Sequence, residues 1–505
     1  MAIEETARSP RQLVGLWAGP LVFAAILFIP LPIELLTQFT DEQMPPDQSA
    51  AAARSAWVVL ALLAFMAIWW VTEAVPIPVA SLLPMVVLPL WNVAGLGDVA
   101  GEYLHPVVVL LLAGFILARS IERWNLHERI ALNVVVRFGK SRAGLIGGFM
   151  MASAVLSMWI SNTATAIMMV PIALSVAAAL SSPEDEREQF TLALLLGIAF
   201  ACSIGGLGTY IGTPTNLLIK DAIERSTGQQ ITFVDWMLFG LPAVIVLVPL
   251  AWVVLTRMAF KIDSDKSESG KATVKKRLEI LGTLTVPERR VLTVFALVAS
   301  LWVLGRPISE LVILGTQPFA GLSDQVTALL GVFLCFIIPA GSASQQNTTL
   351  LDWRTAESIP WGVVLLFGGG MALAAFIRSS GLGDWIGGEL EIFATLPVIL
   401  LIAIVTTVII FVTEITSNVA TAAASMPVLV ALAERTGLDV VMLAAPVALA
   451  ASCAFMLPMA TGPNAVIHAT DRVPLPTMAR AGLRLNLAAI PVITILAYFL
   501  APVTF

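Results

Sequence analysis

Long apolar runs recur from one end of the chain to the other, and they limit the folds that it can adopt. Stretches such as WVVLALLAFMAIWW and LAAIPVITILAYFL carry no charged residue. An α-helix needs about 20 apolar residues to cross a hydrocarbon core about 30 Å thick. Of the 505 residues, 58% are hydrophobic and 12% are charged, whereas about 25% are charged in soluble domains. The runs also lack the alternation of a transmembrane β-barrel, so the sequence predicts an all-α polytopic membrane protein.

The runs divide into about 11 transmembrane helices and two longer stretches with a polar centre. We expect spanning or near-spanning segments at 14–37, 54–72, 76–95, 106–118, 190–225, 232–256, 290–305, 323–340, 361–377, 438–470 and 483–503. The longer stretches, 143–180 and 395–434, each have room for two half-helices, and their centres read SNTAT and SNVAT. A polar tip inside an apolar stretch is typical of a re-entrant hairpin, because its backbone groups find partners only in protein, water or ligand.

The distribution of Lys and Arg predicts how the chain is oriented in the membrane. If the N-terminus is cytoplasmic and both hairpins are re-entrant, the inside carries 22 of the 28 Lys and Arg residues and the outside carries six. Cytoplasmic loops carry an excess of these residues. If the first hairpin crossed fully, the basic loop at 257–290 would lie outside, against this rule. We therefore expect an integral plasma (inner) membrane protein with a cytoplasmic N-terminus and an external C-terminus.

The two halves of the chain repeat each other at a nearly constant spacing. GFILARSIERWNL (114–126) aligns with GMALAAFIRSSGL (370–382) at an offset of 256, and the same offset pairs Asn162 with Asn418. GTPTN (212–216) aligns with ATGPN (460–464) at an offset of 248. Because the charge pattern places the first hairpin inside and the second outside, the halves are predicted to be inverted. Inverted repeats with broken helices that meet near the midplane are typical of secondary transporters.

The predicted helices are interrupted at four places, 161–163, 205–216, 417–419 and 458–464. Gly and Pro cluster in GGLGTYIGTPTN and LPMATGPN, and such clusters interrupt helices. The oxygen-bearing side chains near the breaks are Ser157, Ser161, Asn162 and Thr213 in the first half and Thr413, Ser417, Asn418 and Thr461 in the second. Neutral oxygens without a dense set of carboxylates suit Na⁺ better than Mg²⁺ or Ca²⁺, and half-helix N-termini suit an anion. Such side chains can also serve only to hydrogen-bond neighbouring helices, but their recurrence beside both Gly/Pro breaks favours ion sites.

At these motifs the chain resembles the divalent anion–sodium symporter family of di- and tricarboxylate and sulfate transporters. SNTAT, SNVAT, GTPTN, MLPMATGPN and WWVTEAVPIPVASLLP carry the resemblance, which spans nearly the whole chain. The resemblance implies a homodimer in which each protomer has a scaffold domain and a transport domain that moves as an elevator. The implied parts are 1–105 (N-terminal scaffold helices), 106–231 (first-repeat transport part, with hairpin 143–180 and broken helix 190–225), 232–360 (scaffold helices with the cytoplasmic loop 257–290) and 361–505 (second-repeat transport part, with hairpin 395–434 and broken helix 438–470, and the last helix).

The resemblance also implies roles for individual residues. One Na⁺ is expected with Ser157, Ser161, Asn162 and the backbone of Gly212, and a second with Thr413, Ser417, Asn418 and the backbone of Ala460. Substrate carboxylates are expected to meet Asn162, Thr163, Asn418, Thr213 and Thr461. Two positions depart from the family pattern. Val419 stands where the second tip often has Thr, and Gly462 stands where members often have Pro.

Glu414 is an acidic residue inside the second hairpin, and the first half has Met158 at the equivalent position. Ionisable groups within membrane segments are functional candidates. One interpretation is a hydrogen bond that supports the second cation site, and the other is proton coupling. We favour the first.

The sequence therefore predicts Na⁺-coupled import of small dianions through a lipid membrane, with dicarboxylates such as succinate or malate first. The alternatives within the family are a dicarboxylate exchanger and a sulfate or tricarboxylate transporter. A cation/proton antiporter or an arsenite-type permease would need titratable groups at the breaks, where only Glu414 qualifies. No nucleophile–base pair or metal-ligand set indicates an enzyme, and we expect no nucleic-acid partner.

Overall fold

The protein is helical, as the sequence predicts. The computed structural model describes residues 8–39, 46–138, 141–180, 184–262, 268–341, 348–390, 393 and 395–505. Within these residues, eight helices are long and apolar enough to cross a membrane. Three shorter apolar helices outside the hairpins bring the described candidates to the predicted number of spans; they are Ile77–Leu90, Asp324–Ile337 and Val440–Ala451.

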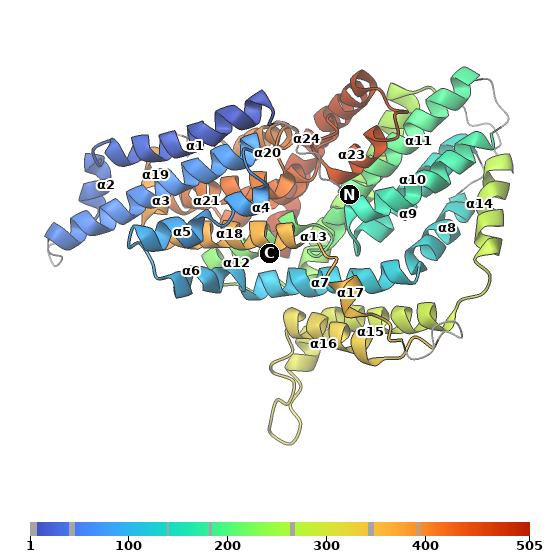
Figure 1. Ribbon diagram of the computed structural model, residues 1–505, viewed down its shortest axis with the longest axis horizontal. Coiled ribbons are helices and arrows are strands. Elements are labelled where there is room, and N and C mark those ends of the chain that lie inside the picture. Colours follow the sequence, from blue (N-terminus) through green and yellow to red (C-terminus); the bar gives the residue numbers. More distant parts are fainter. Residues whose placement is uncertain are drawn as a thin grey trace.

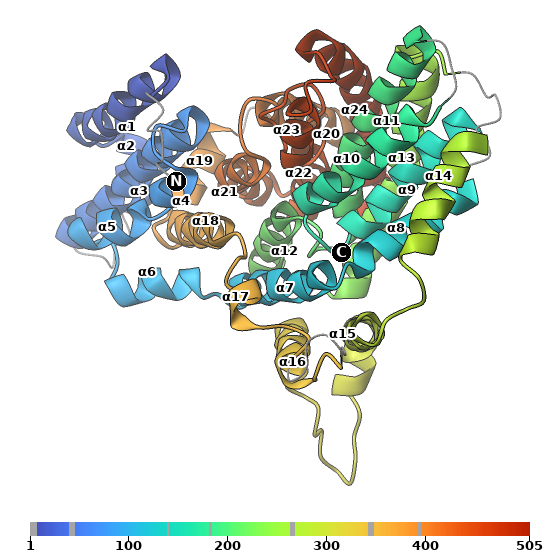
Figure 2. The same cartoon turned by 45° about the vertical axis from the view of Figure 1, so that its right-hand side comes forward.

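The N-terminal part forms one end of the molecule (Figures 1 and 2). Its helices are α1 (Pro10–Phe28), α2 (Ile33–Gln38), α3 (Pro46–Thr72), α4 (Ile77–Ala80), α5 (Leu83–Leu90) and α6 (Leu96–Tyr103). The long helices α1 and α3 pack against each other. Gly15 and Gly19 lie buried on the contact face, where α3 leaves no room for a Cβ.

The first repeat occupies the opposite end of the long axis and the centre (Figure 1). Its elements are α7 (Pro106–Arg123), α8 (Leu126–Phe138), α9 (Arg142–Ser157), α10 (Asn162–Ala178), α11 (Glu184–Gly205), a 3₁₀ turn at Gly206–Gly208, α12 (Pro214–Thr227) and α13 (Phe233–Val253). The chain continues through a π-helical turn at Val254–Ala259 into α14 (Glu268–Ile280), which lies in the predicted polar loop.

The second repeat follows after α15 (Val286–Ser309), α16 (Asp324–Ile337) and the short α17 (Trp353–Ala356). Its elements are α18 (Trp361–Ser379), α19 (Leu382–Glu389), α20 (Val398–Thr413), α21 (Asn418–Thr436), α22 (Val440–Ala451), α23 (Gly462–His468) and α24 (Leu475–Thr504). In both views α15, α16 and the loop between them project from one side of the molecule (Figures 1 and 2).

The sequence repeat reappears in the boundaries of the helices. The helices α9 and α20 begin and end at positions 256 apart, and α10 and α21 both start at the repeated Asn, with Ser161 and Ser417 as their N-cap residues. Each pair of helices forms a hairpin whose turn is the polar tip. The helices α11 and α22 are equivalent and are buried along most of their length. The hydrophobic core therefore surrounds the helix that precedes each break.

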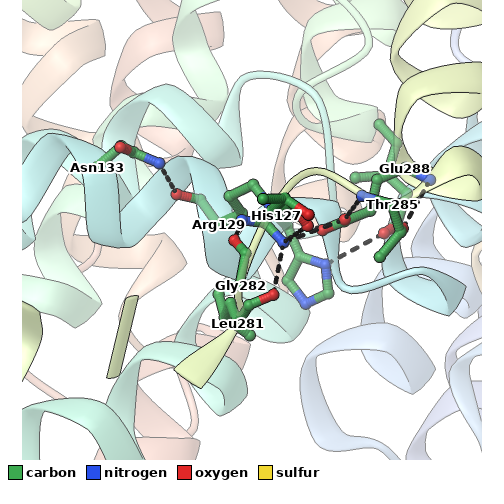
Figure 3. Close-up of polar contacts among 9 residues, drawn as sticks. His127, Arg129, Asn133, Leu281, Gly282, Thr285 and Glu288 are labelled. Atoms are coloured by element: carbon green, nitrogen blue, oxygen red, sulfur yellow. Dashed lines mark hydrogen bonds and ion pairs between the residues drawn. The ribbon is translucent and has the colours of Figure 1, made fainter. Parts of the chain in front are cut away.

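The short helix α8 is anchored to the start of α15 by one charged cluster (Figure 3). The Arg129 Nε atom donates to Glu288 Oε1 over 2.9 Å, and its Nη1 atom donates to the carbonyl of Gly282 over 2.8 Å. Both ionic side chains are at most 12% exposed. Glu288 also accepts from the backbone N–H of Thr285 as part of the capping box of α15. One guanidinium thus joins α8 to both the helix and the linker that precedes it.

The equivalent helix of the second repeat, α19, is anchored differently. Trp385, 256 residues after Arg129, packs edge-on against Trp57 of α3 with ring centroids 5.9 Å apart. The Trp57 indole N–H donates to the carbonyl of Ile26 in α1. In the first repeat, α8 is therefore attached to α15 by charged contacts, whereas in the second repeat α19 is attached to α3 by aromatic packing.

Candidate functional site

The two hairpin tips and the two helix breaks line one cavity of about 570 Å³. The polar side chains at its centre come from four separate segments of the chain; they are Ser161, Asn162, Thr163, Thr213, Asn418 and Thr461. One wall is formed by α7 and by the start of α18. Because α10, α12 and α21 all begin at this cavity, it lies at the positive ends of three helices.

The same hydrogen bond supports each hairpin tip. The Ser157 hydroxyl at the end of α9 donates to Asn162 Oδ1 over 2.5 Å, and the Thr413 hydroxyl at the end of α20 donates to Asn418 Oδ1 over 2.9 Å. Ser157 and Thr413 are fully buried behind the cavity wall. Each donor therefore fixes the orientation of an Asn amide that faces the cavity.

In each helix break, an Asn side chain donates hydrogen bonds to two backbone carbonyls in the same way. Asn216 Nδ2 donates to the carbonyls of Gly206 and Thr209 over 2.9 and 2.8 Å. Asn464 Nδ2 donates to the carbonyls of Ala454 and Leu457, both over 3.1 Å. All these positions are related by the offset of 248. Since a buried carbonyl without a partner is costly, the two Asn residues stabilise the non-helical backbone.

Several oxygen atoms converge at the first break. A Cβ at Gly206 would lie 2.9 Å from Asn162 Oδ1 and 3.3 Å from the carbonyl oxygen of Gly212. Only glycine allows the Asn162 amide, whose Nδ2 would lie 3.0 Å from the same Cβ, to approach this closely. The side-chain oxygen of Asn162 therefore lies near the carbonyl of Gly212 and accepts from the Ser157 hydroxyl. This set of neutral oxygens fits a monovalent hard cation such as Na⁺.

The second break is longer than the sequence predicts. We expected it at 458–464, but α22 ends at Ala451 and α23 begins at Gly462. The physical reason is Glu414, whose carboxylate accepts from the backbone N–H groups of Phe455, Met456 and Leu457. These N–H groups bond to the carboxylate instead of to carbonyls one helical turn earlier. Pro463 lies in the first turn of α23, a common position for proline.

The two repeats meet at the centre of the cavity. A Cβ at Gly462 would overlap the hydroxyl of Thr163, so the tip of the first hairpin lies directly against the second break. The second limb of each hairpin packs against the post-break helix of the other repeat, α10 against α23 and α21 against α12. Each half of the cavity therefore depends on both repeats.

Charged side chains pair near both ends of α7, but only the network near its C-terminal end lines the cavity. Arg119, Glu122 and Ser358 line the cavity near the C-terminal end of α7. Arg119 donates to Glu122 over 2.7 Å and to the carbonyl of Ser358 over 2.5 Å. At the other end, Arg225 of α12 pairs with Glu102 of α6 and with Asp221, both over 2.8 Å. The second network joins α12 to the helix that precedes α7.

Most of the predicted site residues come together in the structure. The five predicted substrate residues, Asn162, Thr163, Thr213, Asn418 and Thr461, all line the cavity, as do Ser161, Gly212 and Ala460. Ser157, Thr413 and Ser417 do not line it, although the first two contact residues that do. Sequence reasoning did not single out Asn216 and Asn464. The sequence does mark these two residues, because the same Asn recurs at the end of GTPTN and of ATGPN.

The arrangement brings neutral oxygens and helix N-termini together around one cavity. Neutral oxygens gather behind each tip, helix N-termini face the cavity, and the described residues contain no group of three or more His, Cys, Asp or Glu side chains suited to a metal ion. Paired hairpins and broken helices around one internal cavity define a membrane transporter built from two repeats.

Comparison with known proteins identifies the family. The family described as the sodium:sulfate symporter transmembrane region matches residues 14–503, and the chain belongs to this family. A sodium-dependent dicarboxylate transporter of Staphylococcus saprophyticus is 38% identical over 497 residues, which cover 97% of this chain and 92% of that protein. A transporter of the same description from Staphylococcus aureus (strain MRSA252) is 36% identical over 98% of this chain and 92% of that protein. These are transporters, and this chain is a transporter rather than an enzyme.

A solved structure supports the fold. The crystal structure of the Alcanivorax borkumensis YdaH transporter matches with a TM-score of 0.53 and 15% identity, covering 79% of this chain and 86% of that one. At this identity the likeness concerns the fold alone.

Proposed function

We propose that the protein is a Na⁺-driven importer of small dianions, with dicarboxylates such as succinate and malate as its main substrates. The observation that carries the proposal is the single cavity lined by both Asn tips and both helix breaks. The relatives named as sodium-dependent dicarboxylate transporters, which align over almost the whole chain, support both the coupling ion and the substrate class.

In this proposal the substrate binds between the two repeats. Asn162 and Thr163 contact one carboxylate from the first tip, and Asn418 contacts the other from the second. Thr213 and Thr461 complete the site from the breaks. The N-termini of α10, α12 and α21 favour the two negative charges, because their free N–H groups and helix dipoles are directed at the cavity.

Two cations would bind behind the substrate. Ser157, Ser161, Asn162 and the Gly212 carbonyl form the first site, and Thr413, Ser417, Asn418 and the Ala460 carbonyl form the second. The buried hydroxyl groups of Ser157 and Thr413, each within 2.9 Å of an Asn oxygen, fit this assignment. A bound Na⁺ supplies positive charge next to the Asn amides that contact the substrate, so the cation and the dianion stabilise each other.

Transport would follow an elevator-type movement. Both hairpins and both broken helices move together as a transport domain, within the parts 106–231 and 361–505. The scaffold consists of the helices in 1–105 and 232–360, and two protomers associate through their scaffolds. If the N-terminus is cytoplasmic, the end of α7 that carries Arg119 lies on the cytoplasmic side of the membrane. Arg119 and Glu122 line the cavity at this end, whereas Glu102 and Arg225, which pair between α6 and α12, do not line it, and this supports an inward-open state.

A flux experiment tests the proposal. Purified protein in liposomes should accumulate labelled succinate when an inward Na⁺ gradient is applied, and unlabelled malate should compete. Uptake that persists when choline replaces Na⁺ would reject Na⁺ coupling. Uptake only into liposomes preloaded with dicarboxylate would make the protein an exchanger, and stronger competition by sulfate or citrate than by malate would reassign the substrate.

A further inference from the structure

Glu414 is a buried carboxylate surrounded by hydrogen-bond donors. It is 3% exposed and lies at the end of α20, directly after Thr413. Oxygen Oε1 accepts from Phe455 N over 2.7 Å, and Oε2 accepts from Leu457 N over 3.1 Å. Met456 N donates to both oxygens over 3.0 Å. Asn486 Nδ2 of α24 completes the set over 2.6 Å.

The donors around Glu414 favour its anionic form, whereas its burial favours the neutral acid. The three backbone partners can only donate, and the Asn486 amide is placed with Nδ2 toward the carboxylate, while its Oδ1 has no hydrogen-bond partner among the described residues. Donors that converge on a carboxylate favour its charged form.

The negative charge of Glu414 has no cationic side-chain partner among the described residues. None of the ion pairs that these residues form includes it. The exposed Arg11 donates to the carbonyl of the next residue, Ile415, over 3.0 Å, but it forms no ion pair with the carboxylate. A buried charge without an opposite charge is costly. A cation bound nearby would remove this cost.

The second cation site lies beside this carboxylate. Thr413, the preceding residue, bonds to Asn418 and to the carbonyl of Ala451. Leu457, which donates to Glu414, also accepts from the backbone N–H of Ala460 over 3.2 Å. The carboxylate therefore contacts the same turn that presents the Ala460 carbonyl, a proposed ligand of the second cation.

The first cation site has no such charge. Met158 occupies the position equivalent to Glu414, and only its backbone carbonyl contributes, by accepting from the Thr209 hydroxyl over 2.6 Å. A Cβ at Gly208 would overlap the Met158 side chain, so an apolar contact replaces the carboxylate–amide contact of the second half.

We propose that Glu414 is the fixed counter-charge of the second cation site, and that this site therefore binds Na⁺ more tightly than the first and fills before it. The proposal rests on the proposed function, since it assumes two Na⁺ sites. Glu414 is a positioning residue, which acts on the cation through its charge and through the turn 455–460.

Titration of the purified protein with Na⁺ in the absence of substrate tests this order. A ligand that binds only the native state raises the thermal midpoint, and choline keeps the ionic strength constant. We expect Glu414→Gln to raise the Na⁺ concentration for half-maximal stabilisation by about tenfold, because a nearby charge in a low-dielectric interior is lost. Glu310→Gln, which changes an exposed carboxylate in a surface ion pair, is the matched control and should leave the titration unchanged.

A second pair of variants tests the proposal if Glu414→Gln does not fold. Thr413→Val should abolish the low-Na⁺ phase of stabilisation, whereas Ser157→Ala should leave that phase within about twofold of the wild type. A larger effect of Ser157→Ala than of Thr413→Val overturns the proposal, as does a folded Glu414→Gln protein with an unchanged titration. Absence of any Na⁺ response in the wild type would instead overturn the proposed Na⁺ coupling, and this inference with it.

Discussion

In the first half of the site, the Asn162 amide closely approaches the backbone of Gly206, and Met158 contributes only a carbonyl. In the second half, Ala454 stands at the position equivalent to Gly206, and Glu414 stands at the position equivalent to Met158. The supporting hydrogen bonds of the tips and of Asn216 and Asn464 are nevertheless the same in both halves.

The features that the two halves share and the features in which they differ have separate physical causes. The repeated hydrogen bonds satisfy the polar groups of a broken helix in an apolar environment, a need that both halves share. The substitutions change the volume and charge next to each cation site, where the halves have different partners. Two cation sites with the same backbone arrangement can therefore differ in their affinity for Na⁺.

The largest expected effect comes from replacing Gly206 of the first half by Ala, the residue at the equivalent position of the second half. Gly206→Ala places a methyl group 2.9 Å from Asn162 Oδ1, and overpacking of this kind costs about 1–3 kcal/mol. We expect Na⁺-driven succinate uptake to fall by about ten- to a hundredfold, since 1.4 kcal/mol corresponds to about tenfold. Uptake into liposomes and the thermal midpoint measure the two consequences.

The reverse change, Ala454→Gly, is the control for this prediction. It removes one buried methyl group and should cost about 1 kcal/mol or less of stability, with uptake reduced by severalfold at most. Wild-type uptake by Gly206→Ala would show that the close approach of Asn162 to this backbone is not needed.

An intermediate effect is expected at the tips, where Thr163 corresponds to Val419. Thr163→Val keeps the shape but removes a hydroxyl that lines the cavity, and one hydrogen bond contributes about 0.5–1.5 kcal/mol. We expect the KM for succinate to rise by about two- to twelvefold, because this range of free energy converts to such factors. The maximal rate should change less.

Val419→Thr tests the same comparison in the opposite direction. Val419 also lines the cavity, so the added hydroxyl can donate to a substrate oxygen. A lower KM for succinate or for citrate supports contact between the second tip and substrate. An unchanged KM for every dianion and trianion tested would place this side chain away from the substrate.

The smallest effect is expected at the anchors of α8 and α19. Glu288→Gln weakens the contact with Arg129, whereas Trp385→Leu weakens an aromatic contact with Trp57. Each change is expected to cost about 1 kcal/mol. Because the Arg129–Glu288 pair is at most 12% exposed, salt screens it little, so the loss of stability in Glu288→Gln should be similar at low and high salt. A loss that disappears at high salt would argue against a buried charged anchor.

Much of the fold follows from the sequence because its signals are local. Apolar length identifies the spans, and the polar tips SNTAT and SNVAT identify the two hairpins. The constant offset of 256 residues also pairs the two tips with each other. The five predicted substrate residues lie around one cavity, since the repeat places them at equivalent points of the two halves.

The features that the sequence did not predict depend on contacts between distant residues. The second break starts after Ala451 because Glu414, far earlier in the chain, accepts the N–H groups of 455–457. The sequence marks Gly462 only as a departure from a family pattern, whereas the structure relates it to Thr163. The short helices α8 and α19 lie in stretches that carry too little apolar length to be recognised as spans.

The contact between Thr163 and Gly462 has a consequence for synthesis of the protein. The two residues are separated by most of the chain, so the first hairpin is made long before its partner α23 leaves the ribosome. Until then the tip of the first hairpin lacks its final neighbour. Its polar groups must meanwhile bond to water or to the membrane-insertion machinery. Completion of the cavity is therefore a late step of biogenesis, and the N-terminal half made alone should reach the membrane without forming a finished site.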